Sequence, residues 1–303
     1  MPRTPLSADE FRATVVAAPP LAMTAEHRVA VDANVAMLRH IATGGIGIVL
    51  YGENANLYHF TQAQYAEAVE MMTGAPADLR IIPAIGPDLG KMLDQAALIE
   101  RSGLRDVALL PIYGPSDTHG TADGVRRIVD RLGFPVIVDL SRENYIRPVT
   151  LVKLFDEGAV SFVRYSVARR DPADDPYLDA VIKIAGKERV LSGLGETAAF
   201  DHIHKRQLPT VVSGAAAIAP AAVVHLLEAL RADDAGLARR LLVPFHEFDR
   251  IRRMHGPTQV LHNAVAATGI AATGPLIPML SSVKAHFMNE VREAAEALSG
   301  TPV

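Results

Sequence analysis

Apolar and polar positions follow two different periods along this chain, which predict short strands separated by helices. Eight short, mainly apolar runs fit strands that are buried on both faces; they span residues 14–18, 46–51, 80–85, 107–111, 135–139, 160–164, 189–192 and 210–213. Helical periodicity fills the intervals, at residues 25–43, 61–73, 89–102, 122–132, 148–157 and 177–186. Alternating strands and helices predict a parallel sheet, and eight repeats predict that it closes into an α/β barrel, the (β/α)8 or TIM barrel.

The pattern changes after the eighth run, where only helical periodicity remains. The predicted helices lie at residues 221–232, 235–254, 259–268 and 281–298. This is more than the last barrel helix requires, so we expect a C-terminal helical extension. No charge run or Pro/Ser-rich linker separates the two parts. We therefore expect residues 1–218 to form the barrel strands and helices, and residues 219–303 to add the last barrel helix and the extension within the same domain.

Composition narrows the classes of partner. The chain has 303 residues, 49% of them hydrophobic, and a net charge of −4. Because the chain has no stripe of basic residues, we do not expect nucleic acid as a partner. The sequence contains no cysteine, which excludes disulfides and a thiolate nucleophile. Residues 1–10 lack an apolar signal core. Two uncharged stretches, residues 208–227 and 260–283, contain Pro and Gly and fit core segments better than membrane spans. We expect a cytoplasmic protein with no membrane partner.

Candidate chemistry lies at the ends of the strands, because side chains there point into the active site of a parallel barrel. Arg164 ends the sixth run and Asp139 ends the fifth. Guanidinium stays protonated in proteins and cannot attack a carbonyl as a lysine amine can. Arg164 therefore has two interpretations: an ion pair with Asp139 or Glu53, or a clamp for a carboxylate or phosphate. Asp139 is correspondingly either a general base or the counter-ion of Arg164.

Short motifs at these strand ends resemble one enzyme family, over nearly the whole chain. In order they are Gly52-Glu53-Asn54, Leu110-Pro111-Ile112-Tyr113, Leu191-Ser192-Gly193, Ser213-Gly214 and Pro275-Leu276-Ile277-Pro278. Together they resemble the dihydrodipicolinate synthase / N-acetylneuraminate lyase family of class I pyruvate-type aldolases. The resemblance implies a lyase without a cofactor that assembles as a homodimer or homotetramer. The turn containing Tyr113, which looks exposed, and the Ala-rich tail also favour a homo-oligomer.

The chain departs from the family pattern at three chemical positions. The family has a lysine at the end of strand six, which forms an imine with a 2-oxo acid, where this chain has Arg164. It has a tyrosine at the end of strand five, where this chain has Asp139, and paired hydroxyl residues where this chain has Leu50 and Tyr51. We expect the catalytic residues to be Arg164, Asp139 and Tyr51. We expect substrate binding by Gly52, Glu53, Asn54, Tyr113, Arg142, Ser192, Gly193 and Ser213.

The resulting hypothesis is a carbon–carbon or carbon–oxygen lyase that binds a small anionic, 2-oxo acid-like metabolite, without an imine, a metal or a cofactor. The alternative is a non-catalytic homologue that binds a metabolite. A relocated nucleophile would have to be Lys91, the lysine expected nearest to the mouth of the barrel. A metal site would need clustered ligands, but His202 and His204 would face different sides of a helix. His59 and His119 are expected on loops.

Overall fold

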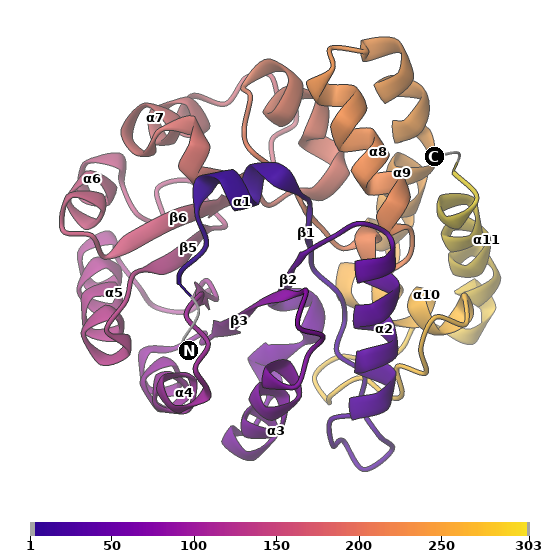
Figure 1. Cartoon of the computed structure of the whole chain (residues 1–303), viewed down its shortest axis with the longest axis horizontal. Helices are drawn as coiled ribbons and strands as arrows, with labels where there is room; N and C mark the ends of the chain where they lie inside the picture. Colours follow the sequence, from indigo (N-terminus) through magenta and orange to yellow (C-terminus); the bar gives the residue numbers. More distant parts are fainter. Residues whose placement is uncertain (1–3, 302–303) are drawn as a thin grey trace.

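A computed structural model describes residues 4–301 and contains an eight-stranded parallel barrel ringed by helices (Figure 1). The strands are β1 (Val16–Ala17), β2 (Ile48–Tyr51), β3 (Arg80–Ile85), β4 (Ala108–Leu109), β5 (Val136–Leu140), β6 (Val160–Tyr165), β7 (Val190–Ser192) and β8 (Val212–Ser213). Each strand from β1 to β6 pairs in parallel with the next, and β1 also pairs with β8. A parallel bridge between Ser192 and Val211 joins the two ends of the sheet. The predicted TIM barrel is therefore confirmed.

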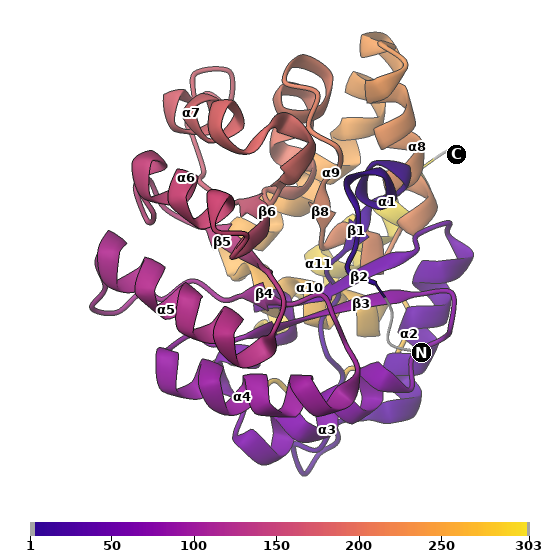
Figure 2. The same cartoon turned by 60° about the vertical axis from the view of Figure 1, so that its left-hand side comes forward.

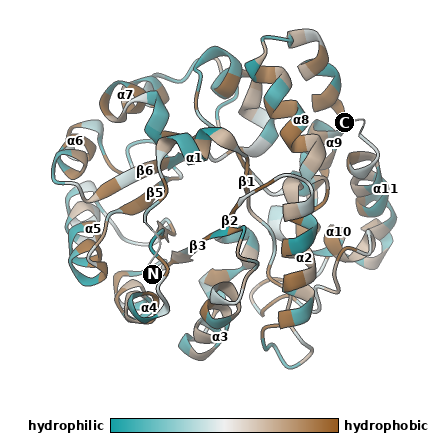
Figure 3. Cartoon of the chain, viewed as in Figure 1, coloured by the Kyte–Doolittle hydropathy of each residue, from teal (hydrophilic) through white to brown (hydrophobic). Residues whose placement is uncertain are grey.

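The helices cover the outside of the barrel and bury their apolar faces against it. They are α1 (Ala8–Ala13), α2 (Val31–Thr43), α3 (Gln62–Thr73), α4 (Leu89–Ser102), α5 (Thr118–Leu132), α6 (Pro148–Asp156), α7 (Pro176–Ala185), α8 (Pro220–Arg231), α9 (Ala235–His255), α10 (Pro257–Ala267) and α11 (Met288–Ser299). Figure 3 shows brown and teal faces on α2 and α5, as expected for helices with one side in the core. A capping box between Thr61 and Gln64 begins α3.

The predicted C-terminal extension is formed by α9, α10 and α11, with α9 beside α8 (Figures 1 and 2). α9 packs against α8, α10 and α11. α10 also packs against η1 (Glu53–Ala55), the short turn that follows β2. The extension therefore reaches the end of the barrel at which the strands terminate, and it can contribute side chains to a site there.

Two predicted helices begin later than expected. The helix predicted at 25–43 begins at Val31, because Thr24 accepts hydrogen bonds through Oγ1 from the amides of Glu26 and Arg28 and stabilises a turn instead. The helix predicted at 281–298 begins at Met288, after a short turn at residues 285–287. The short helix α1 was not predicted, and the helix expected around His202 and His204 is a π-helical segment, η5 (Phe200–Lys205). Across residues 4–301, no helix has the length and apolar character needed to cross a membrane.

Candidate functional site

A cavity of about 450 Å³ opens at the C-terminal ends of the strands. Glu53 and Asn54 follow β2, Arg164 lies in β6, Gly193 follows β7, and Gly214 follows β8; all of them line it. Residues of α9 and α10 form another part of its wall. This is the end of a parallel barrel at which active sites are built, because the loops that follow the strands converge there.

Arg164 is held between two carboxylates at this cavity. Its Nη1 lies 2.5 Å from Asp139 Oδ2 and its Nη2 lies 3.5 Å from Glu53 Oε2. The side chains of Arg164 and Asp139 are 12% and 3% exposed, whereas that of Glu53 is 33% exposed. Burial lowers the pKa of Arg164, but Asp139 and Glu53 outweigh burial and raise it, so the guanidinium stays charged. With both carboxylates ionised, the three side chains carry a net charge of −1.

Asp139 is a buried acid with an unusual titration. Burial raises its pKa from 3.8 to about 6 despite the opposing effect of Arg164. Its Oδ1 has no hydrogen-bond partner among the described residues, and neither does Arg164 Nε or the hydroxyl of Ser141 or Ser166. Ser141, Arg164 and Ser166 line the cavity. This part of the cavity therefore offers buried polar atoms that a ligand or water can satisfy.

The tyrosines differ in whether they reach the cavity. Tyr51 is fully buried, its hydroxyl has no partner among residues 4–301, and burial raises its pKa. It does not line the cavity, whereas Tyr113 and Tyr58 do. Tyr113 donates a hydrogen bond from its hydroxyl to Glu53 Oε1 at 3.3 Å, and Tyr58 donates to a carbonyl of the loop after β4. Tyr113 and Glu53 are thus the adjacent proton-transfer groups that the structure brings to the cavity.

Three of the side chains that we expected to bind substrate point elsewhere and do not line the cavity. Ser192 Oγ lies 2.8 Å from Nδ1 of the buried His202. Ser213 donates to the Glu196 carboxylate and accepts from a backbone amide. Arg142 donates to the loop after β4 at 2.7 Å and stacks on a tyrosine ring. These side chains stabilise the strands and loops around the cavity, and their hydroxyl and guanidinium groups already have protein partners.

Two of the predicted glycines allow close approach of the backbone. A Cβ at Gly193 would lie 2.9 Å from both Arg164 Cγ and the carbonyl oxygen of Tyr165. Because real Cβ contacts are longer than this, only glycine lets the end of β7 approach β6 at this point. A Cβ at Gly52 would lie 2.9 Å from Leu50 Cδ2. Gly193 lines the cavity and Gly52 does not.

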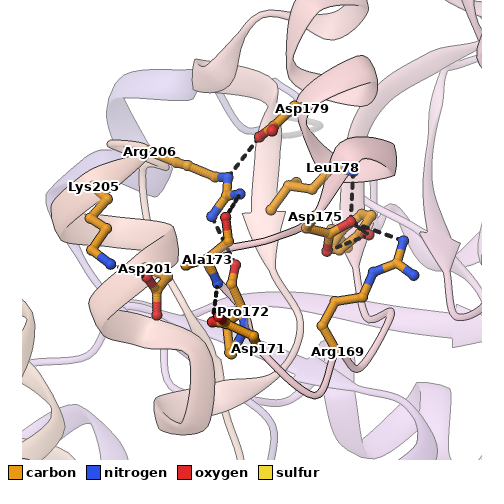
Figure 4. A network of polar contacts seen from close by, with 11 residues as sticks. Arg169, Asp171, Pro172, Ala173, Asp175, Leu178, Asp179, Asp201, Lys205 and Arg206 are labelled. Carbon is orange, nitrogen blue, oxygen red and sulfur yellow. Dashed lines mark hydrogen bonds and ion pairs between the residues drawn. The ribbon is translucent and has the colours of Figure 1, made fainter.

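The loop that follows Arg164 is fixed by a network of polar contacts (Figure 4). Arg206 donates to the Asp179 carboxylate at 2.8 Å and to two carbonyls of the loop. Arg169 Nη2 lies 3.0 Å from Asp175 Oδ1, and the same carboxylate accepts from the Tyr165 hydroxyl at 2.8 Å. Asp175 also caps α7. The segment after β6 is therefore anchored to α7 and η5, which fixes the end of β6 that carries Arg164.

Arg252 is a cavity residue that sequence reasoning missed. It lies in the last turn of α9 and lines the cavity. Its Nη2 donates to Asn54 Oδ1 and its Nε to the Pro257 carbonyl, each at 3.3 Å. Burial lowers its pKa. The helical periodicity of residues 235–254 did not indicate that the end of this helix returns to the barrel mouth, so the sequence offered no signal for Arg252.

No lysine lines the cavity within the described part of the chain. Lys91 lies close by in the first turn of α4, but its Nζ donates to the Tyr58 carbonyl at 2.7 Å. His59 lines the cavity, and burial together with Lys91 lowers its pKa. His119 is on the exposed first turn of α5 rather than on a loop. Among residues 4–301, no three His, Asp or Glu side chains are grouped so that they could hold a metal ion.

Comparison with solved structures identifies the same fold in several enzymes. No protein-family model and no curated protein sequence matches the chain. A dihydrodipicolinate synthase from Aquifex aeolicus is 16% identical, with a TM-score of 0.83 over 95% of this chain and 99% of that one. The sialic acid aldolase of Ruminococcus gnavus is 14% identical, with a TM-score of 0.82 over 95% of this chain and 97% of that one. YagE from E. coli, solved with pyruvate, is 14% identical, with a TM-score of 0.81 over 94% of this chain and 98% of that one.

This chain has the dihydrodipicolinate synthase fold. The match runs along almost the whole of each chain, so it includes both the barrel and the C-terminal helices. The fold implied by the sequence resemblance is therefore confirmed.

Proposed function

We propose that this protein is a carbon–carbon or carbon–oxygen lyase related to the dihydrodipicolinate synthases and sialic acid aldolases, and that it acts on a small 2-oxo acid-like anion without forming an imine. The observation that carries the proposal is Arg164, which lies at the cavity within an ion-paired set with Asp139 and Glu53. The sialic acid aldolase of Ruminococcus gnavus has a catalytic lysine. Here the cavity has arginine at the end of β6 and is lined by no lysine of residues 4–301.

The geometry supports a division of roles for such chemistry. Arg164, which is permanently charged, would donate a hydrogen bond to the oxo oxygen and stabilise the negative charge that forms there. For carbon–oxygen cleavage, Glu53 would accept the proton from C3, the carbon next to the oxo group, with Tyr113 as its hydrogen-bonded neighbour at 3.3 Å. The C–H electron pair would form the enolate and then the C3–C4 double bond, while the C4–O bond breaks and the hydroxyl leaves as water with the proton that Glu53 returns. For carbon–carbon cleavage, Glu53 would instead accept the proton of the C4 hydroxyl; the C3–C4 bond would break to release an aldehyde, and its electron pair would form the enolate, which takes that proton at C3. Asp139 would hold Arg164 in place and balance its charge.

Incubation with pyruvate and borohydride tests the absence of an imine. A guanidinium with delocalised lone pairs forms no reducible adduct, so intact-mass measurement should show no mass gain. Wild-type sialic acid aldolase, treated in parallel, serves as the positive control. A stoichiometric adduct would contradict the proposal, and if peptide mapping located it at Lys91, that lysine would be a relocated nucleophile.

A panel of 2-oxo acids tests the activity. We expect at least one to raise the melting temperature and to be turned over. A 2-oxo acid that raises the melting temperature of the protein but is not converted would favour the alternative function, a non-catalytic protein that binds a metabolite. If none is bound, the proposed substrate class is wrong.

A further inference from the structure

The two arginines that line the cavity differ in their charge partners. Arg164 has two carboxylates, Asp139 and Glu53. Arg252 forms no ion pair with any described residue, and its two hydrogen bonds, both 3.3 Å long, go to neutral oxygens. Its Nη1 makes no hydrogen bond within residues 4–301. Arg252 is therefore a cavity cation whose charge is not neutralised by a direct partner.

The carboxylates nearest to Arg252 are bonded to other groups. Asp249 Oδ2 accepts from the Thr197 hydroxyl at 2.9 Å and pairs with Arg253. Glu196 accepts from a serine hydroxyl, and burial raises its pKa. These two acids influence Arg252 only over a longer distance, and the effect of burial prevails, so its pKa is lowered. A half-buried cation in this state is stabilised by an anion that reaches it.

The surroundings of Arg252 are arranged to orient its guanidinium. Asn54 donates from its amide nitrogen to the Ala18 carbonyl at 2.8 Å, which turns its amide oxygen toward Arg252. A Cβ at Gly214 would lie 3.0 Å from Asn54 Nδ2 and 3.4 Å from Arg252 Nη1, so glycine leaves the room that both side chains use. Thr258, in the first turn of α10, lines the cavity beside them.

We propose that Arg252 binds the carboxylate of the substrate and that the Arg164–Glu53 end of the cavity receives its oxo or hydroxyl group. An anion placed at Arg164 would meet two carboxylates and a net charge of −1, whereas the same anion placed at Arg252 meets an unpaired guanidinium that can donate two parallel hydrogen bonds. This inference rests on the proposed function and narrows its substrate class to small oxo or hydroxy acids that reach from α9 to β6.

Calorimetric titration of wild type, Arg252→Gln and Arg240→Gln with pyruvate and with inorganic phosphate tests the site. Arg240 is an exposed residue of the same helix, so its substitution changes the net charge equally. We expect Arg252→Gln to weaken binding of both anions by roughly tenfold or more, and Arg240→Gln to leave it unchanged. Pyruvamide, which lacks the negative charge, should bind wild type and Arg252→Gln equally weakly.

Arg252→Lys keeps the charge but loses the planar pair of donors, so its affinity should fall between wild type and Arg252→Gln. This second variant decides the question if the glutamine variant does not fold. Equal binding of pyruvate by wild type and either Arg252 variant would overturn the inference while leaving the proposed function intact. The absence of any anion binding by wild type would also overturn it. Phosphate binding that depends on Arg252, without binding or turnover of any oxo acid, would support the anion site and refute the proposed function.

Discussion

At the residue scale, the behaviour of Arg164 depends on the two acidic side chains beside it. Arg164, Asp139 and Glu53 form one electrostatic unit, and a lysine at the same place would share its charge with the same two acids. The unit explains how a permanently charged residue is accommodated in a buried position, because each partner reduces the cost of burying the other. Arg252 of α9, by contrast, forms no ion pair with a side chain of residues 4–301.

The pH dependence of stability should reveal the buried state of Asp139. Burial raises its pKa from 3.8 to about 6 in the folded protein. Between these values the folded chain keeps the proton that the unfolded chain has lost, so the contribution of this group to the free energy of unfolding falls as pH rises. Denaturant titrations should show that the stability of wild type relative to Asp139→Asn declines from about pH 4 to about pH 6 and is level above.

Comparison with Asp139→Asn removes the contributions of the other acids, provided that the same buffers and salt concentration are used. A relative stability that rises with pH below about pH 4 and is level from pH 4 to pH 6 would mean that Arg164 dominates over burial and holds the pKa of Asp139 below its ordinary value.

Replacing Arg164 with lysine should not create an aldolase. A lysine at this position would lie against Asp139 and Glu53, and these acids favour its protonated form, which is not a nucleophile. Leu50 and the buried Tyr51 also lack hydroxyls that reach the cavity. We expect Arg164→Lys to show no pyruvate–borohydride adduct at neutral pH and no aldol cleavage, measured by intact mass and by pyruvate release. Robust turnover by this single variant would mean that the other differences from the family pattern, at Asp139, Leu50 and Tyr51, have little effect on catalysis.

Position along a strand predicted some site residues and not others. Arg164, Asp139 and Glu53 were predicted to meet because the ends of parallel strands share one mouth, and the structure brings them within ion-pair distance. The same reasoning placed Ser192 there, but it could not reveal the buried His202 that captures its hydroxyl. Arg252 was missed because its place depends on how a helix of the extension packs, which local sequence does not encode.

At the element scale, the contact between the ends of β6 and β7 depends on a glycine. Gly193→Ala would place a Cβ 2.9 Å from Arg164 Cγ and from the Tyr165 carbonyl, so one of the strands must shift. We expect a loss of about 1–3 kcal/mol in the free energy of unfolding, together with weaker ligand binding.

Chemical denaturation of Gly193→Ala and of Gly90→Ala would test this expectation. Gly90 lies in α4 with no atom closer than 3.5 Å to its Cβ position, so that control should be neutral or slightly stabilising. Equal stability of the two variants would contradict the close approach of Gly193 to β6.

Element boundaries show where periodicity is informative and where it fails. All eight apolar runs overlap a strand, because burial on both faces leaves a continuous apolar signal. The start of α2 was predicted six residues early, since the apolar residues before Val31 are buried by a turn and a bridge between Met23 and Val29 rather than by a helix. Periodicity reports burial, and a folded loop can bury residues as well as a helix does.

At the scale of the whole molecule, one face of the barrel carries apolar surface that favours self-association. Leu89 and Tyr113 are 39% and 66% exposed. Beside them, an apolar cavity of about 280 Å³ is lined by α4, α5 and the loop after β4, including Leu89, Met92 and Ile112. Exposed apolar surface of this kind marks protein contacts more often than free surface. We therefore expect a homo-oligomer with two-fold symmetry in which this face is buried.

Light scattering on wild type, Leu89→Glu and Val149→Glu would test the assembly and the face together. A charge at Leu89 would be buried without a partner in the expected interface, so this variant should dissociate to the monomer mass of 32.5 kDa. Val149, 67% exposed on α6, is the matched control and should retain the mass of wild type. A monomeric wild type at micromolar concentration would refute the oligomer. Dissociation by Val149→Glu but not by Leu89→Glu would locate the contact on α6 instead of the face between α4 and α5.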